Sequence, residues 1–570
     1  MKNTQWMIYT KRADFNALAA RFSVSPILAR IMINRGVLPE EFGDYLGGSL
    51  AELPDARLLR DIDRAADILL EKRDGGRRVR IIGDYDIDGV CSTYILYTGL
   101  RALGMRVDYD IPDRIRDGYG LNIKLIERAA EEQVDTILTC DNGIAAVEEI
   151  ERAKACGLTV IVTDHHEPGH YADGSEKLPP ADAVVDPKRE GSRYPFHAIC
   201  GAVVAWKLIG LLFVRCGTEL REWEALLPFA AIATVGDVMP LKKENRVIVR
   251  EGLRAVPGCG NPGLRALLEL CGLDQRRLTA YHIGYVIGPC LNAGGRLESA
   301  KVGLRMLLEK DPSEAHRLAE HLKELNDERK QVTMDGLREA EAQLDGGKEG
   351  VLVVYLPDCH ESVAGIIAGK LKERCYRPSI VLTNCSDPEL VKGSGRSIEG
   401  YHMFQALEAV SDLLVKFGGH PMAAGLTLRR EDIGALRQRL NQNAALTEEQ
   451  LTEKLWIDLA LPFSHTSEAL VEELARLEPF GQGNEKPVFA QKNVRILSLR
   501  VFGKNRNVIK LRLCGEEGTQ RDALLFADGD TFLQEKGERE CFDILYYPEI
   551  DSYMGRNTLQ LVLKGWKFRN

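Results

Sequence analysis

The 570-residue sequence has 13 cysteines but no Cys-x-x-Cys pair. Without thiols at that spacing we expect no zinc finger, and an odd number of cysteines cannot all be joined in disulfides within one chain. Reduced thiols are typical of a cytoplasmic protein, so we expect a cytoplasmic location.

Long apolar runs are also absent. The opening residues, MKNTQWMIYTKRADF, carry charge, and no apolar run follows them, so they do not have the pattern of a secretory signal peptide. The most apolar segment, residues 198–214, is interrupted by Lys207 and is too short to span a bilayer. We interpret this segment as a buried helix, and we expect no membrane partner.

The sequence lacks a net positive charge, since its formal net charge is −9. This argues weakly against a protein that merely coats nucleic acid, although carboxylates that hold metal ions also count as negative. Positive charge is concentrated late in the chain, because residues 486–512 contain eight Lys/Arg and no Asp/Glu. A nuclease with a local basic surface is compatible with this balance.

What the sequence does contain is a series of short apolar runs that end in aspartates, with helical patterns between them. Residues 79–82 precede Gly83-Asp84, 136–140 precede Asp141, 158–163 precede Asp164, and 183–185 precede Asp186. Strands rich in Val and Ile that alternate with helices predict a parallel sheet covered on both faces. Ligands bind at the carboxyl ends of such strands, where each run delivers its acid.

The pattern along the chain predicts an α/β protein of five parts. These are a helical lead-in (1–50), an α/β domain with the parallel sheet (51–311), a long connecting helix (312–346), a second α/β domain (347–450) and a small β-barrel (451–570).

The strongest local signal is Gly83-Asp84-Tyr85-Asp86-Ile87-Asp88-Gly89. Three carboxylates within five residues repel one another unless a cation neutralises them. A solvated acidic loop is the alternative for this segment taken alone. An EF-hand is rejected because its Gly and bidentate Glu are not at the required positions.

Three further motifs carry candidate ligands. They are Asp164-His165-His166, Cys140-Asp141-Asn142-Gly143 and Val235-Gly236-Asp237-Val238. Carboxylate oxygens with one histidine, and no thiolate, suit Mn²⁺ or Mg²⁺ better than zinc or copper. Two such ions about 3.5–4 Å apart can polarise a phosphoryl group and generate hydroxide.

The motifs DYDIDG, DNG, DHH and GDV, in this order, resemble the four motifs of the DHH phosphoesterase superfamily. The resemblance implies that Asp86 and Asp141 bind a first metal ion. It implies a second ion at Asp88, Asp141, His165 and Asp237. His166 would face the scissile phosphate and Asp164 would support the site. Many relatives have a histidine where this chain has Ile82, and Asp84 is the available substitute ligand.

Several other stretches resemble the RecJ exonucleases within this superfamily, from about Trp6 to Leu563. They are IPDR with GYG (111–114, 118–120), YPF (194–196), GPCLNAGGR (288–296), GSGRS (393–397), FGGHPMAAG (417–425) and EPFGQGN (478–484). The resemblance implies a DHH domain, a DHHA1 domain and a C-terminal OB-fold, with 5′-to-3′ exonuclease activity on single-stranded DNA in repair and recombination.

The same resemblance, together with glycine-flanked arginines that can approach phosphates, implies a set of DNA-binding residues. In the two α/β domains they are Arg114, Tyr119, Asn292, Arg296, Ser394, Arg396, Gly419 and His420, and in the barrel they are Lys504, Arg506 and Lys510. Phe489, Phe502, Tyr546 and Tyr547 are candidates for base stacking, with core packing expected for at least half of them, and Tyr553 is a further candidate. A monomer is expected, with single-stranded-DNA-binding protein and a helicase as candidate partners.

The sequence also bears on other functions. Residues 365–371 (GIIAGKL) are not a phosphate loop, because the glycine spacing is one residue short and Leu follows Lys, so no ATP dependence is expected. A phosphodiesterase of cyclic dinucleotides or short oligonucleotides is one rival, which the basic barrel disfavours. A non-catalytic replication scaffold is another, which the complete set of acids disfavours. Processing of RNA ends stays open.

Overall fold

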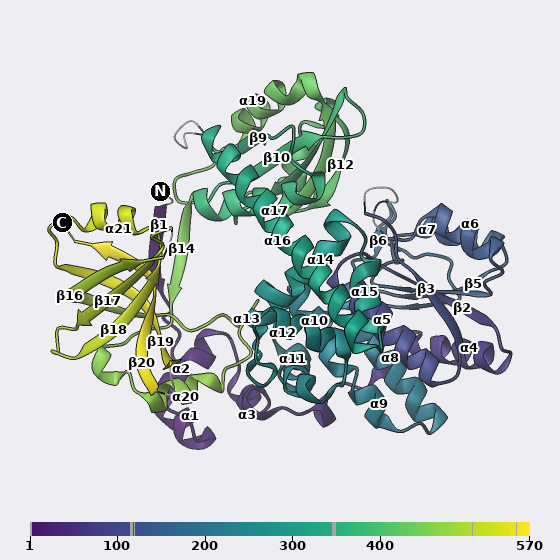
Figure 1. Ribbon diagram of the computed structural model, residues 1–570, viewed down its shortest axis with the longest axis horizontal. Helices are drawn as coiled ribbons and strands as arrows, with labels where there is room; N and C mark the ends of the chain where they lie inside the picture. The colour runs from purple at the N-terminus through teal and green to yellow at the C-terminus, as the bar shows by residue number, and fades with distance from the viewer. Residues whose placement is uncertain are drawn as a thin grey trace. The chain divides into compact units, whose positions relative to one another are not determined.

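The computed structural model describes residues 3–114, 118, 120–344, 349–503, 505–553 and 556–569. Tyr119 and Lys504, two of the predicted DNA-binding residues, lie outside the described residues. The chain forms two compact units (Figure 1). The larger unit comprises Met1–Gln5, Pro54–Met239 and Glu251–Glu453, and the smaller unit comprises Trp6–Leu53, Pro240–Arg250 and Lys454–Asn570.

The larger unit is built on a five-stranded sheet of order β3-β2-β4-β5-β8, in which every pairing is parallel. Its strands are β2 (Arg78–Gly83), β3 (Arg106–Asp110), β4 (Thr136–Cys140), β5 (Thr159–Thr163) and β8 (Ala183–Val185). Helices α6 (Ile123–Glu131) and α7 (Val147–Ala155) cover one face, and α4 (Ile62–Asp74), α5 (Ile87–Ala102) and α8 (Gly201–Cys216) cover the other (Figure 1). The predicted α/β fold with a parallel sheet is confirmed.

The apolar segment interpreted as a buried helix is α8. Its one buried cation, Lys207, is 4% exposed, and its Nζ donates to the carbonyl oxygen of Pro54 at 3.1 Å. Burying an ammonium group requires such partners, and the Tyr194 ring at 5.2 Å adds another. Within the described residues, no helix is both long enough and apolar enough to cross a membrane.

Further helices follow along the chain. They are α9 (Leu220–Glu224), α10 (Leu227–Gly236), α11 (Lys243–Ala255), α12 (Pro262–Leu270), α13 (Ala280–His282), the π-helical turn η6 (Ile283–Ile287), α14 (Gly288–Leu297), α15 (Lys301–Leu308) and α16 (Pro312–Ala342). The last is a helix of 31 residues with little β-branching, in the segment where a connecting helix is expected.

A second sheet in the larger unit has the order β12-β13-β11-β10-β9. Its elements are β9 (Leu352–Tyr355), α17 (Glu361–Cys375), β10 (Ser379–Asn384), β11 (Leu390–Arg396), α18 (Met403–Glu408), β12 (Leu414–His420), β13 (Ala423–Arg429) and α19 (Ile433–Asn443). Residues 365–371 lie inside α17, so this segment is a helix and not a phosphate loop, as expected.

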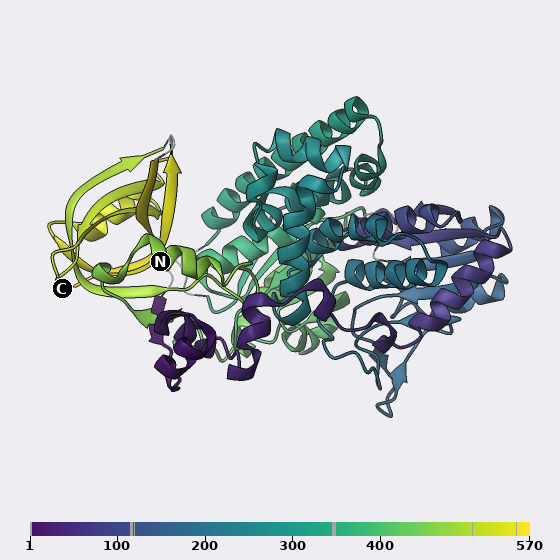
Figure 2. The ribbon, with the colours of Figure 1, turned by 90° about the horizontal axis from the view of Figure 1, so that it is seen from below.

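The smaller unit contains a barrel whose long strands curve around one core (Figure 2). Its strands are β15 (Leu459–Ala460), β16 (Phe489–Phe502), β17 (Val508–Cys514), β18 (Gln520–Phe526), β19 (Cys541–Tyr553) and β20 (Arg556–Phe568), and β16 also pairs with β19 to close the sheet. Helices α20 (Glu468–Ala475) and α21 (Gly529–Lys536) belong to it, and the N-terminal helices α1 (Phe15–Phe22), α2 (Pro26–Asn34) and α3 (Phe42–Gly47) contribute to the same core.

The barrel confirms one expectation and corrects another. Phe489, Tyr546 and Tyr547 are at most 5% exposed, so three of the four stacking candidates are core residues, as expected for at least half of them, whereas Phe502 is 42% exposed. The basic stretch does face acids in space, because Arg506 pairs with Asp530 at 2.8 Å and Arg512 pairs with Asp522 at 3.0 Å. These partners come from later strands and helices, which a local count of charges does not include.

Candidate active site

The candidate ligands gather at the carboxyl edge of the parallel sheet. Three groups have ligand atoms that lie within 4.8 Å of one another: Asp84, Asp86 and Asp141; Asp88, His165 and Asp237; and Asp141, His165 and His166. The residues follow β2, β4 and β5, begin α5, or end α10, so five elements converge on one point.

The first turn of α5 fixes two of the carboxylates. Asp86 caps the helix and accepts hydrogen bonds from the backbone N–H groups of Asp88 at 2.9 Å and Gly89 at 3.1 Å. Asp88 is fully buried and accepts from the N–H groups of Gly201 at 2.6 Å and Ala202 at 2.7 Å, at the start of α8. A helix N-terminus favours a negative charge, so α8 holds the Asp88 carboxylate in one orientation.

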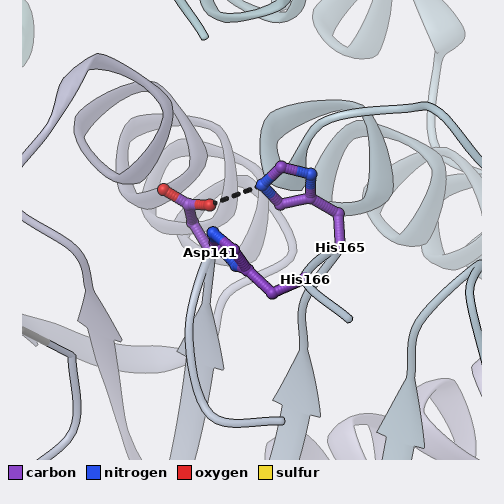
Figure 3. Close-up of side chains that lie close together, drawn as sticks. All are labelled: Asp141, His165 and His166. Atoms are coloured by element: carbon purple, nitrogen blue, oxygen red, sulfur yellow. Dashed lines mark hydrogen bonds and ion pairs between the residues drawn. The ribbon is translucent and has the colours of Figure 1, made fainter. Parts of the chain in front are cut away.

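Asp141 lies at the centre of the site. Its backbone has a φ of 60°, a left-handed conformation that Asp adopts more readily than most residues. Its Oδ1 is 3.0 Å from Nε2 of His165, as Figure 3 shows with His166 alongside. The same nitrogen is 3.5 Å from Asp88 Oδ2 and 3.7 Å from Asp237 Oδ2, so His165 links three carboxylates.

The buried carboxylates of the site repel one another. Burial, followed by repulsion from neighbouring acids, raises the pKa of Asp84 to about 8 and that of Asp237 to about 8. Burial likewise raises the pKa of Asp88 and Asp141, with further contributions from nearby aspartates. A divalent cation would let all four ionise, and this donor set of oxygens with a neutral histidine fits Mn²⁺ or Mg²⁺. Burial lowers the pKa of His165, which keeps its ring neutral and able to bind a metal ion.

The second histidine of the motif has a different environment. His166 Nδ1 is 2.7 Å from Asp164 Oδ1, and its side chain is 44% exposed. Burial lowers the pKa of His166, but the hydrogen bond and charge of Asp164, together with the charges of Asp237 and Asp88, outweigh it and raise the pKa to about 9. Asp164 is buried, which raises its pKa, but His166 and the N–H of Ile144 at 2.9 Å lower it below its ordinary value. His166 is therefore a protonated, half-exposed group at neutral pH.

Three arginines form a second cluster in the same unit. Arg296 on α14 donates from Nη1 to the carbonyl oxygen of Ser362 at 2.7 Å, and Arg396 on β11 donates to Ser394 Oγ at 3.0 Å. Burial, then the charges of Arg114, Arg329 and Arg396, lower the pKa of Arg296 to about 10. Among the described residues, Arg114, Arg296 and Arg396 have no carboxylate in an ion pair, which is the arrangement of an anion site.

No described contact joins the remaining predicted DNA-binding residues to this arginine cluster. Asn292 lies on α14 with its Oδ1 buried and without a hydrogen-bond partner among the described residues. Gly419 and His420 are exposed at the end of β12, where a φ of 147° and the carbonyl oxygen of Ala423 leave no room for a side chain at Gly419. Arg506 and Lys510 belong to the smaller unit.

Two features near the candidate ligands were not assigned to the site from the sequence. Asp186, after β8, is fully buried, and burial together with Asp164 raises its pKa to about 7. The run of residues 183–185 into Asp186 was the available signal. The N–H donors of Gly201 and Ala202 gave no signal, because they belong to the start of an apolar helix and contribute no polar side chain.

Comparisons with known proteins follow the same division of the chain. Family models match the DHH family N-terminal domain at residues 78–234, the DHHA1 domain at 348–446 and the RecJ OB domain at 457–565. The "Single-stranded-DNA-specific exonuclease RecJ" of Bacillus subtilis (strain 168) is 35% identical over 569 residues, which cover 98% of this chain and 70% of the relative. The protein of the same name from Dickeya dadantii (strain 3937) is 34% identical, over 95% of this chain and 96% of the relative.

Solved structures agree with these relatives. The crystal structure of RecJ in complex with Mn²⁺ from Thermus thermophilus matches with a TM-score of 0.85 and 29% identity, covering 100% of this chain and 80% of that one. A second structure of RecJ from the same organism, in complex with Mg²⁺, matches with a TM-score of 0.78 and 27% identity, covering 100% of this chain and 79% of that one. The predicted α/β, DHHA1 and OB-fold domain types are therefore confirmed.

Proposed function

This chain belongs to the RecJ family of single-stranded-DNA-specific exonucleases, and we propose that it hydrolyses the phosphodiester bonds of single-stranded DNA from the 5′ end with two Mn²⁺ or Mg²⁺ ions. The observation that carries the proposal is the group of buried carboxylates around Asp141, whose raised pKa values call for cations.

The proposed ligands divide between two sites. Asp84, Asp86 and Asp141 hold the first ion, with Asp84 in place of the family histidine, since Ile82 is buried in the core. Asp88, Asp141, His165 and Asp237 hold the second ion. When bound, two such ions polarise the phosphoryl group and lower the pKa of an attacking water.

The protein's own groups position the phosphate. His166 is charged and half-exposed, and Asp164 holds its Nδ1, so its Nε2 is directed to donate to a non-bridging phosphate oxygen. Arg296, Arg396 and Arg114 are proposed to hold further phosphates of the strand, with Ser394 and Arg114 near the 5′ end. Bidentate guanidinium contacts fix a phosphate without reading the base, which suits an enzyme that degrades any sequence.

Digestion of end-labelled DNA tests this function. Single-stranded DNA should be shortened from its 5′ end in Mn²⁺ or Mg²⁺, blunt double-stranded DNA should resist, and EDTA should stop the reaction. Degradation of single strands in EDTA, or equal degradation of duplex, would contradict the proposal. The same assay with single-stranded RNA decides whether a 2′-hydroxyl is tolerated.

Arg396→Ala should weaken the binding of single-stranded DNA without changing metal binding. Arg396 is held by Ser394 and by the Gly395 carbonyl oxygen, and no described carboxylate competes for its charge. Loss of one charge-assisted phosphate contact corresponds to about 1.5–3 kcal/mol, or roughly 10- to 150-fold in KM for a 5′-phosphorylated strand. Arg439→Ala, which breaks an exposed pair with Asp412, is the matched control. Unchanged KM and kcat for Arg396→Ala would refute the assignment.

The barrel is proposed to bind the strand backbone through Arg500 and Lys510. The two residues are directly opposite in the β16–β17 pair, so their side chains share one face, and Lys510 is exposed. Replacing both by alanine should flatten the dependence of log K on log salt by about 0.7 per lost phosphate contact for a long single strand. Arg506→Ala should change the slope less, because Asp530 already neutralises Arg506. An unchanged slope for the double variant would show that Arg500 and Lys510 do not contact the strand and are only solvated surface residues.

The biological setting is also a proposal. We place the enzyme in the cytoplasm, as a monomer in DNA repair and recombination, with single-stranded-DNA-binding protein and a helicase supplying the substrate. A phosphodiesterase of cyclic dinucleotides remains the rival function, and turnover of such a compound without turnover of long single strands would favour it.

A further inference from the structure

Two exposed tyrosines form a stacked pair on the larger unit. Tyr281 on α13 and Tyr285 on η6 are 63% and 71% exposed, and their ring centroids are 4.8 Å apart with an angle of 27° between planes. Residues four apart on a helix lie on the same side, which brings the rings together. Both rings are largely exposed, so the stacked pair is accessible from solvent.

This pair lies next to elements that carry the metal ligands. A side chain on Gly284, between the tyrosines, would approach Val235 Cγ1 to 3.6 Å, and Val235 is two residues before Asp237. At the other end of η6, a side chain on Gly288 would lie 3.3 Å from Ile87, which separates Asp86 from Asp88. The π-helical turn is therefore packed against both metal-bearing segments, and π-helical turns are often found at functional sites.

Val238 supports the same interpretation. It directly follows Asp237, is 65% exposed and has a φ of 57°, a conformation that a β-branched residue rarely adopts. An exposed valine in a strained conformation therefore lies directly after a proposed metal ligand, and such strain is often found at functional sites.

The charge around the tyrosines suits a polyanion. Residues 275–297 contain no Asp or Glu, but they contain Arg276, Arg277, His282 and Arg296. Arg276 and Arg277 are exposed shortly before Tyr281, and the nearest acid to Arg277 in an ion pair is Asp274 at 4.0 Å. The same segment ends at Arg296 in the arginine cluster, so a strand along it meets no carboxylate of that segment.

We propose that Tyr281 and Tyr285 form a stacking platform for the nucleobases of the single strand whose phosphates occupy the catalytic centre. The inference rests on the proposed function and adds a base-contacting site to it. Every base has a π-face, so stacking holds a strand without sequence preference. A paired base is already stacked and covered by its neighbours in the duplex, so the platform would favour unpaired bases.

Binding of a single strand that carries 2-aminopurine tests the platform directly. The full-length protein is used in EDTA, so that the strand is not cut, and stacking is read as quenching of the 2-aminopurine fluorescence. The double variant Tyr281→Ala/Tyr285→Ala should lose the quenching and bind about ten-fold more weakly. The double variant Tyr281→Phe/Tyr285→Phe keeps both aromatic rings, so it should retain the quenching and the affinity of the wild type. Tyr171→Ala removes an exposed tyrosine (52%) from another part of the same unit and is the matched control.

A strand with abasic positions separates base stacking from other contacts. The wild-type protein should bind this strand about ten-fold more weakly than the intact one, whereas the double alanine variant should bind the two equally. Unchanged affinity and quenching in the alanine variant would overturn the platform. That result would leave the proposed nuclease function intact if the wild type degrades single strands in Mn²⁺, whereas absence of such degradation would refute the function itself.

Discussion

Asp141→Ala should abolish nearly all turnover, with a loss of about 10³-fold or more in kcat. Asp141 belongs to two of the three ligand groups and its Oδ1 lies 3.0 Å from His165 Nε2, so its removal affects both proposed ions. Metal ions contribute several kcal/mol of transition-state stabilisation, and about 1.36 kcal/mol corresponds to a factor of ten in rate. Release of nucleotides from a labelled single strand in Mn²⁺ measures the effect.

The same substitution should not destabilise the metal-free protein. Burial and the neighbouring aspartates raise the pKa of Asp141, which means that its ionised form is unfavourable in the folded state. Removing the carboxyl relieves that repulsion, so Tm in EDTA should stay the same or rise, whereas addition of Mn²⁺ should stabilise the variant less than the wild type. Asp173→Ala, in an exposed loop, is the control and should retain both activity and the metal response. Full activity of Asp141→Ala would refute the proposed metal centre.

The sequence predicted the parallel sheet because its central strands are nearly continuous apolar runs. Strand β4 lies at residues 136–140 as expected, and β2 and β5 differ from the expected bounds by one residue at one or both ends. Strand β3 was not predicted, since Arg106–Asp110 carries alternating charge and has an exposed and two half-buried positions. It is one of the two edge strands of this sheet, with a neighbouring strand on one side, and the apolar pattern weakens there.

Motif positions predicted which side chains meet in the candidate site, but the backbone that holds them could not be predicted. Asp84, Asp86 and Asp141 are brought together as strand ends and a helix start imply. The donors to Asp88 come from α8, more than a hundred residues later. Their roles as ligands stay predictions until the substitutions are made.

The barrel illustrates the limit of local sequence patterns. Eight cations without a nearby acid in the sequence predicted an uncompensated basic face, yet Asp530 and Asp522 approach Arg506 and Arg512 in the fold. Neighbours across strands are set by register, which no charge count along the chain contains. In the same way, the N-terminal helices share the barrel's core although hundreds of residues separate them in the sequence.

Gly201→Ala should reduce kcat by about 10²-fold although Gly201 contributes no side chain. A Cβ at this position would lie 2.9 Å from the Cβ of Asp141 and 3.0 Å from its Cα, closer than side chains normally approach. Relief of this contact requires α8 to move away from Asp141, and that motion also displaces the N–H of Gly201 from Asp88. A misplacement of about 1 Å in a catalytic group can cost roughly 10²-fold in rate.

Weaker metal binding should accompany the loss, because two proposed ligands shift together. The expected result is a higher concentration of Mn²⁺ for half-maximal activity and a lower kcat at saturation, with overpacking lowering the stability by about 1–3 kcal/mol. Gly369→Ala is the matched control: it lies within α17, nothing is within 4 Å of the place its Cβ would occupy, and it should keep full activity while gaining about 0.4–1 kcal/mol of stability. If Gly201→Ala is folded, as judged by circular dichroism, and has the kcat and metal requirement of the wild type, the close approach of α8 to Asp141 is not needed for catalysis.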